Sequence, residues 1–173
     1  MLKTLPLSIF CLATPVLAED RWMVIPAAPL MPAAVSSGMA PVNGIQMYFA
    51  TYGAGDPVLL IHGGPGHADI WANQVVDLMA DHLVIVADSR GHGRSTRNAA
   101  PYSYELMSED YVALLDFLKI DKVDLVGLSD GGIIGLDIAM NHPERLDHLF
   151  VDAANITVDG IDPAVLTNAT FGT

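Results

Sequence analysis

The sequence is poor in cysteine and carries none of the familiar patterns that hold a metal or a nucleotide. Its only cysteine, Cys11, lies in an apolar N-terminal stretch, and without it the chain has neither a disulfide nor a thiolate nucleophile. No two of the six histidines have a spacing such as H-E-x-x-H, so we expect no metal site. The run "GHGRST" has no lysine where a phosphate loop needs one, and "GGPGHA" is a broken dinucleotide fingerprint. We therefore expect no cofactor.

Positive charge is also scarce. The chain has 8 lysines and arginines against 20 aspartates and glutamates, which gives a net charge of -12. An acidic surface of this kind repels the phosphates of nucleic acids and of anionic lipids. The composition therefore argues against a nucleic-acid partner, and it leaves the reaction open.

The N-terminus is typical of a secretory signal peptide. Lys3 gives a short positive start, residues 5–17 are mostly apolar, and the stretch ends in a small-residue pattern at Ala18. The apolar run is too short and too interrupted by proline to cross a bilayer. We expect a signal peptide over residues 1–18, cleavage after Ala18, a periplasmic or secreted product, and no stable membrane anchor.

The chain beyond Ala18 has the length of one domain with a core of its own. Residues 19–38 are rich in proline and alanine, which predicts an extended lead-in. A hairpin is expected next, because Asn43-Gly44 joins two strand-like stretches and suits the positive φ angles of a tight turn. The core domain is expected to span residues 39–154.

From residue 57 onward the pattern alternates between buried strand and helix. Strands that are apolar on both faces and are separated by helices form parallel sheets. We therefore expect an α/β fold with a mostly parallel sheet flanked by helices. In the second helix, Ser108 and the acidic pair Glu109-Asp110 suit a first turn. The expected strands cover 57–63, 83–90, 122–129 and 147–154, and the expected helices cover 68–82, the stretch around Met107–Leu118, and 131–141.

Three glycine-rich turns come after three of these strands, at the edge where open α/β sheets bind ligands. They are the runs His62–Gly66, Asp88–Ser95 and Gly127–Gly131. The third, "GLSDG", fits G-x-S-x-G between a strand and a helix, which is the setting in which a strained turn exposes a nucleophilic serine. Taken alone, Ser129 could equally be the N-cap of an ordinary helix. The presence of the other two turns favours the nucleophile.

With these motifs in this order, the chain resembles the N-terminal part of an α/β-hydrolase, of the branch with an HGGPG turn that includes proline iminopeptidases and small esterases. The resemblance runs from about Met39 to Asn155. It implies that Ser129 is the nucleophile and that the backbone N–H groups of Gly64 and Asp130 form the oxyanion hole. The side chain of Asp130 has a plainer explanation, since the helix dipole favours an acid at a helix N-terminus.

The resemblance also exposes a departure from the family. The family's triad runs in the order Ser, acid, His, with the last two after the seventh and eighth strands. Here six strands are predicted and residues 155–173 resemble only the start of a lid, so we expect an incomplete core of about six of eight strands, a truncated chain and little activity. His67, which opens a helix at the ligand-facing edge, is the one candidate base. Asp152 is a weak candidate for the acid, and a solvent-facing aspartate at a strand end explains it as well; Asp88 and Arg90 resemble the family's structural turn.

Three functions stay open. The first is a serine hydrolase that acts on an ester or amide bond of a small molecule, the second is a non-catalytic protein that binds ligands in the same pocket, and the third is a degenerate fragment without function. A binder has no need of Ser129 in a strained turn. By the same resemblance, a serine there disfavours epoxide-hydrolase and dehalogenase chemistry, which use an aspartate. The apolar strand 147–154 is also expected to form a sheet edge that invites pairing with a second chain.

Overall fold

The computed structural model describes residues 30–155 and residue 157. The expected signal peptide (1–18), the first part of the lead-in and nearly all of the segment 155–173 lie outside these residues. In the part that is described, no helix is long and apolar enough to span a membrane. The lead-in ends earlier than expected, because the first strand already begins at Ser36.

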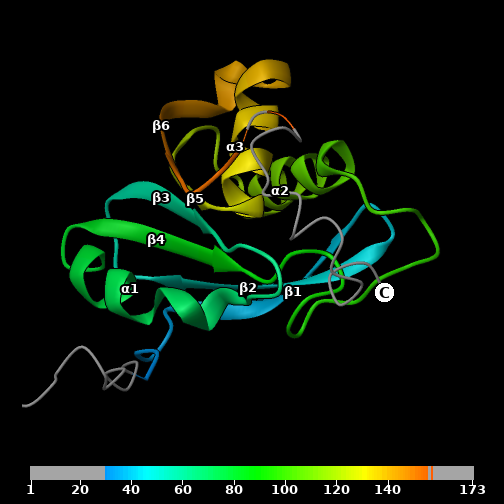
Figure 1. Ribbon diagram of the computed structural model, residues 1–173. Helices are drawn as coiled ribbons and strands as arrows, with labels where there is room; N and C mark the ends of the chain where they lie inside the picture. Colours follow the sequence, from blue (N-terminus) through cyan, green and yellow to red (C-terminus); the bar gives the residue numbers. More distant parts are fainter. Residues whose placement is uncertain (1–29, 156, 158–173) are drawn as a thin grey trace, which may run out of the picture.

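A single six-stranded sheet organises the described chain (Figure 1). Its strands lie in the order β1-β2-β4-β3-β5-β6, and the last four in this order run parallel to one another. The first two strands form the expected antiparallel hairpin. The mostly parallel sheet is therefore confirmed. The strands are β1 (Ser36–Val42), β2 (Ile45–Tyr52), β3 (Asp56–Ile61), β4 (His82–Ala87), β5 (Val123–Leu128) and β6 (Leu146–Asp152).

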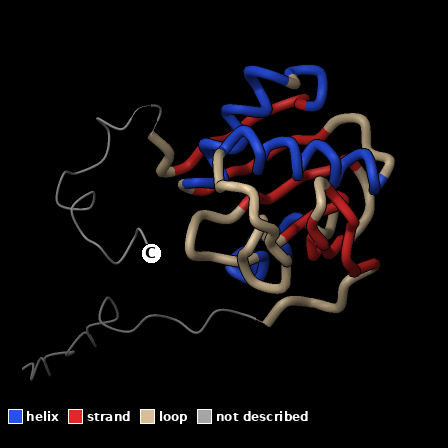
Figure 2. Tube along the Cα trace, turned by 90° about the vertical axis from the view of Figure 1, so that its right-hand side faces the viewer, coloured by secondary structure: helices blue, strands red, loops and turns tan. Residues whose placement is uncertain are grey.

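Helices cover both faces of this sheet, as Figures 1 and 2 show. In β3, Val58 and Leu60 pack in the cluster that includes the residues of α1, whereas Leu59 and Ile61 pack in the cluster that includes α2 and α3. Strand residues that alternate between two apolar layers explain why the run reads as continuously hydrophobic. The helices are η2 (Ala68–Trp71), α1 (Ala72–Leu78), α2 (Tyr104–Leu118), α3 (Asp130–Asn141) and η3 (Pro143–Arg145).

The turn of the hairpin has the conformation that its sequence predicts. Asn43 has a φ of 40° and Gly44 a φ of 78°. Both values lie in the left-handed region, which asparagine and glycine adopt most readily. The hairpin prediction is therefore confirmed down to its turn.

The helix predicted over residues 68–82 is shorter and is divided. A 3-10 turn comes first, and the α-helix after it ends at Leu78. The N-cap of the 3-10 turn is His67, whose ring accepts a hydrogen bond from the backbone N–H of Asp69.

The predicted start of the second helix is wrong. The helix begins at Tyr104, and the hydroxyl of Ser103 caps it by accepting the N–H of Leu106. Ser108 and Asp110 are therefore interior residues of α2, and both are buried. Their partners are distant in sequence: Ser108 donates to Asp137 of α3, and Asp110 pairs with Arg90.

The pair Arg90–Asp110 is the most buried ion pair of the described chain. Both side chains are 1% exposed, and the guanidinium donates to both carboxylate oxygens, at 2.7 and 2.8 Å. The carboxylate also accepts from the side chain of Asn43 at 3.0 Å. This pair ties the loop after β4 to α2 and to the hairpin turn. The structural role expected for Arg90 fits these contacts.

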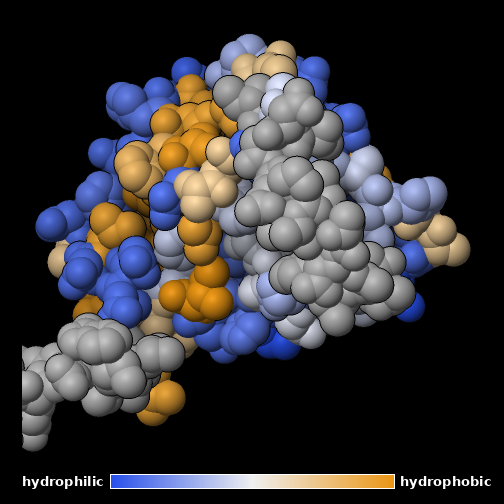
Figure 3. Space-filling view, in the orientation of Figure 1, coloured by the Kyte–Doolittle hydropathy of each residue, from blue (hydrophilic) through white to orange (hydrophobic). Residues whose placement is uncertain are grey.

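Strand β6 lies at the edge of the sheet and is its least covered strand. None of its seven residues is fully buried, whereas the last four residues of β3 and of β4 all are. Phe150 is 63% exposed. In the orientation of Figure 1, hydrophobic residues gather on the side of the molecule where β5 and β6 lie (Figure 3).

Candidate active site

Ser129 stands at a strained turn between β5 and α3. Its φ of 52° and ψ of -116° are unusual for a residue that has a Cβ atom. The neighbouring glycines make this turn feasible: a Cβ at Gly127 would meet the backbone of Gly131, and a Cβ at Gly131 would meet the carbonyl of Ile61. The strand–turn–helix setting predicted for G-x-S-x-G is confirmed.

The first glycine-rich turn lies directly against Ser129. A Cβ built on Gly63 would be 3.0 Å from the Cβ of Ser129 and 3.6 Å from its Oγ. A Cβ on Gly64 would be 2.5 Å from Oδ2 of Asp130. The residues expected to act together, Ser129, Gly64 and Asp130, are therefore brought to one place by the ends of β3 and β5.

The two backbone groups expected to donate to an oxyanion have no acceptor among the described residues. Asp130 is the first residue of α3, and the N–H groups of a first helical turn have no intrahelical partner. The N–H of Gly64 likewise donates no hydrogen bond to another residue in the described part of the chain. Within that part, neither group is used by the fold.

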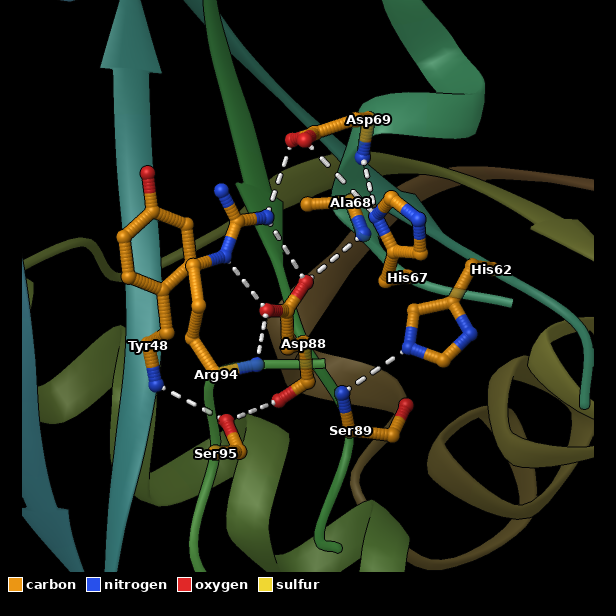
Figure 4. Close-up of polar contacts among 9 residues, drawn as sticks. All are labelled: Tyr48, His62, His67, Ala68, Asp69, Asp88, Ser89, Arg94 and Ser95. Carbon is orange, nitrogen blue, oxygen red and sulfur yellow. Dashed lines mark hydrogen bonds and ion pairs between the residues drawn. The ribbon is translucent and has the colours of Figure 1, made fainter. Parts of the chain in front are cut away.

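His62 links the first glycine-rich turn to the second, through a bond to Ser89 that Figure 4 shows. Its side chain is buried, its Nε2 accepts the backbone N–H of Ser89 at 2.9 Å, and its Nδ1 donates to the carbonyl of Gly63 at 2.8 Å. Burial is the main reason that the pKa of His62 lies below its ordinary value. The ring therefore favours its neutral form.

Asp88 ties the second turn to the start of the 3-10 turn η2. Its carboxylate accepts the backbone N–H of Ala68 and both the backbone and the guanidinium of Arg94 (Figure 4). Although burial opposes ionisation, the bonds from Arg94 and Ala68 hold the pKa of Asp88 below its ordinary value. The guanidinium of Arg94 also stacks 3.7 Å above the ring of Tyr48. These contacts fit the structural role expected for Asp88.

A cavity of about 410 Å³ opens next to Asp130. Within it, the hydroxyl of Tyr104 donates to Oδ1 of Asp130 at 2.9 Å. Burial and this bond raise the pKa of Tyr104 to about 12, so its hydroxyl stays a proton donor at neutral pH. The side chain of Asp130 therefore has a partner besides the helix dipole, which the sequence did not reveal. The cavity is lined by His92, Tyr102, Ser103, Tyr104, Glu105, Met107 and Asp130.

Among the described residues, neither the side chain of the candidate base nor that of the candidate acid forms a hydrogen bond to Ser129. His67 is half exposed, caps the 3-10 turn and lies near Asp69, and it does not line the cavity. His92 does line it, and its Nε2 would be 3.9 Å from a Cβ on Gly64. His92 belongs to the second glycine-rich turn, and no spacing in the sequence predicts that it lies beside Gly64. Asp152 has an exposed side chain, and only its backbone carbonyl, which accepts the N–H of Ser129 at 2.8 Å, contacts the site.

A six-stranded sheet with a strained serine after β5, facing a glycine-rich donor turn after β3, defines the class of protein. The chain belongs to the alpha/beta hydrolase fold family, whose sequence model matches residues 56–173. The family expected from the three motifs is confirmed. The matches do not test the HGGPG branch, which stays a prediction.

The curated relatives are named as hydrolases. The chain is 37% identical over 115 residues to the putative carbamate hydrolase RutD of Azorhizobium caulinodans. The matched stretch covers 66% of this chain and 43% of the relative. It is 33% identical to 3-oxoadipate enol-lactonase 2 of Acinetobacter baylyi (62% and 41% covered) and 37% identical to the 2-hydroxymuconate semialdehyde hydrolase of a Pseudomonas species (74% and 48% covered). The chain spans less than half the length of each of these relatives.

Solved structures give the same fold. Est816, described as an N-acyl homoserine lactone degrading enzyme, superposes with a TM-score of 0.70 at 32% identity over 79% of this chain and 54% of that one. The epoxide hydrolase CorEH superposes with a TM-score of 0.71 at 28% identity, over 79% and 50%. Both likenesses therefore extend over most of this chain.

Proposed function

We propose that this chain carries the nucleophile and the oxyanion hole of a serine hydrolase that cleaves an ester or amide bond of a small molecule. In this proposal Oγ of Ser129 attacks the acyl carbon, and the N–H groups of Gly64 and Asp130 stabilise the negative oxygen that forms. Collapse of this intermediate expels the alcohol or amine, and water then releases the acid. The proton of Ser129 passes through a base to the leaving group.

The observation that carries the proposal is the position of Ser129. A residue with a φ of 52°, held with its Oγ against the first glycine-rich turn, is costly as mere architecture. An ordinary helix cap needs no such angle, and the Ser129 side chain makes no capping bond. A carbamate and a lactone, the compounds in the names of two relatives, both offer a carbonyl carbon to a nucleophile.

The 173-residue chain by itself is proposed to be a slow catalyst. The fold's order of Ser, acid and His places the base after β6, and the last histidine of this sequence, His148, lies within β6. His148 pairs with Asp124 near the start of β5, at the opposite end of that strand from Ser129. Triads that lose one member keep only a small part of their rate.

A fluorophosphonate probe tests the nucleophile directly. The serine oxygen attacks phosphorus, fluoride leaves, and the stable adduct is located by peptide mass spectrometry. We expect slow labelling at Ser129, none in Ser129→Ala, and unchanged labelling in the control Ser37→Ala, whose serine is exposed on β1. Labelling at other serines alone would contradict the proposal. A folded chain that binds small esters in the cavity without labelling would support the non-catalytic binder, and a chain that does not fold would support the degenerate fragment.

Two proposals about the whole product rest on sequence and on the sheet edge. We propose that the protein is exported and begins at Glu19 after cleavage, which the intact mass of the secreted form decides. We also propose that the exposed edge of β6 pairs with a second copy when nothing else covers it. Sedimentation velocity of the chain and of a Val151→Pro variant, which cannot extend the hydrogen-bond ladder, would separate the two states.

A further inference from the structure

The contacts of His62 define both the proton and the orientation of its ring. A carbonyl oxygen only accepts and an amide N–H only donates, so Nδ1 must carry the proton it shares with Gly63, and Nε2 must be bare where it meets Ser89. The two distances, 2.8 and 2.9 Å, are those of good hydrogen bonds. Only the neutral ring protonated at Nδ1 satisfies both neighbours.

The Gly63 carbonyl is held from a second direction. It also accepts the N–H of Gly66 at 2.7 Å. This carbonyl and the N–H of Gly64 belong to one planar peptide unit and point in opposite directions. Any contact that fixes the direction of the Gly63 carbonyl therefore also fixes the direction of the Gly64 N–H. The two glycines lie beside Ser129 and Asp130.

We propose that His62 is a positioning residue for the oxyanion hole: its neutral, Nδ1-protonated ring holds the Gly63 carbonyl and so directs the N–H of Gly64. The inference deepens the proposed hydrolase function and rests on it for the meaning of that N–H. His62 touches no reacting atom. It acts through the peptide unit that joins Gly63 and Gly64.

Protonation of His62 would undo this arrangement. A proton on Nε2 would point at the N–H of Ser89, so a buried acceptor would become a second donor and Ser89 would lose its partner. The charged groups that face the ring act in both directions. Burial, His92 at a ring distance of 5.3 Å and His67 lower the pKa of His62, while the Gly63 bond and Asp88 raise it, and the net direction is down.

NMR of the uniformly 15N-labelled 173-residue chain tests the inference without any need for turnover. At pH 7 we expect His62 to show a protonated Nδ1 and a bare Nε2. As the pH falls below 6.5, the amide signals of Ser89 and Gly64 should move together with the His62 ring. A ring protonated at Nε2 at pH 7, or a Gly64 amide that stays still while His62 titrates, would overturn the proposal.

Two substitutions separate the two bonds of the ring. His62→Asn keeps a donor near the place of Nδ1, whereas His62→Gln keeps an acceptor near the place of Nε2. We expect the Gly64 amide signal to stay near its wild-type position in the Asn variant and to move in the Gln variant. The Ser129-dependent rate on p-nitrophenyl acetate should fall by about tenfold in the Gln variant and by about threefold or less in the Asn variant, since loss of a whole donor costs more than either.

A matched control and the order of the two variants decide the outcome. His142→Gln, at the far end of α3, should leave the Ser89 and Gly64 signals unchanged. If the rate of His62→Gln on p-nitrophenyl acetate equals or exceeds that of His62→Asn, the bond to the Gly63 carbonyl does not have the role proposed. If Ser129 proves not to be a nucleophile, the signals of Gly64 still decide the positioning claim, so the two failures are distinguishable.

Discussion

On one side of Ser129 lie the two backbone N–H groups proposed as donors, next to turns held by buried contacts, whereas on the other side no histidine of the described residues forms a hydrogen bond to the serine. The donor side is made of N–H groups that the ends of β3 and β5 place together, supported by His62, Asp88 and their partners. A base is a side chain that a separate segment must carry to the serine. In the proposed site the donor half needs only backbone groups, which the ends of β3 and β5 already bring together.

The same contrast separates the centre of the sheet from its edge. Strands β3 and β4 are buried on both faces, while β6 has no fully buried residue. The donor turn comes directly after β3, so it rests on the best-packed part of the molecule.

Breaking the buried ion pair between Arg90 and Asp110 should have the largest effect on stability. Arg90→Met leaves the buried carboxylate of Asp110 without its partner, and removing one member of a buried pair costs about 3–5 kcal/mol. Urea unfolding followed by circular dichroism measures the loss. The control Lys122→Met removes the exposed pair with Asp147, for which about 1 kcal/mol or less is expected. Equal losses in the two variants would show that burial of Arg90 does not matter.

A methyl group at Gly131, in the turn that holds Ser129, should have the next largest effect. In Gly131→Ala the new Cβ meets the backbone carbonyl of Ile61, which cannot rotate away as a side chain can. Forced contacts of this kind cost about 1–3 kcal/mol, and the serine turn should shift with them, so phosphonate labelling at Ser129 should fall. Gly38→Ala is the matched control, because its Cβ would lie at an ordinary 3.6 Å from Phe49. If Gly131→Ala is as stable as Gly38→Ala and its Ser129 is labelled as fast, the turn around Ser129 is not constrained.

A fall in pH should have the smallest effect on stability. It should weaken the contacts of His62 and strengthen the bond between His142 and Glu109. The folded pKa of His62 is lowered, so the unfolded chain takes up the proton first and stability falls as the pH drops below 6.5. The pKa of His142 is raised by its bond to Glu109, so that contribution is present below 6.5 and is lost as the pH rises through the folded pKa. Urea midpoints between pH 5 and 8 should lose the acid-side slope in His62→Gln and the alkaline-side slope in His142→Gln. Unchanged slopes in both variants would refute this assignment.

The sequence predicts the sheet and the serine turn because their signals are local. Continuous apolar runs mark β3 and β4, and the glycines around Ser129 mark the turn between β5 and α3. The start of α2 was missed because Ser108 and Asp110 look like first-turn residues, while their true partners, Asp137 and Arg90, are far away in the chain.

Within the site, the contacts of the histidines could not be predicted either, because their partners are also far away in the chain. The bond of His62 to Ser89 joins turns 27 residues apart, and the place of His92 beside Gly64 depends on how two loops pack. No spacing in the sequence encodes either contact. The motif G-x-S-x-G, in contrast, carries its own geometry, since the residues that shape the turn are next to the serine.

The most direct test adds to this chain a segment that carries an acid and a histidine. The chain is joined after β6 to the C-terminal part of a relative such as the Pseudomonas hydrolase, which this chain matches over 48% of the relative's length, and the rate on p-nitrophenyl acetate is compared with that of the 173-residue chain. We predict a rise on the order of a thousandfold or more, because a serine with donors gains its acid and base, and complete loss of the gain in Ser129→Ala. A 173-residue chain that is already fast, or a folded fusion whose rate does not change in Ser129→Ala, would contradict the claim that this chain holds the donor half of a serine hydrolase site.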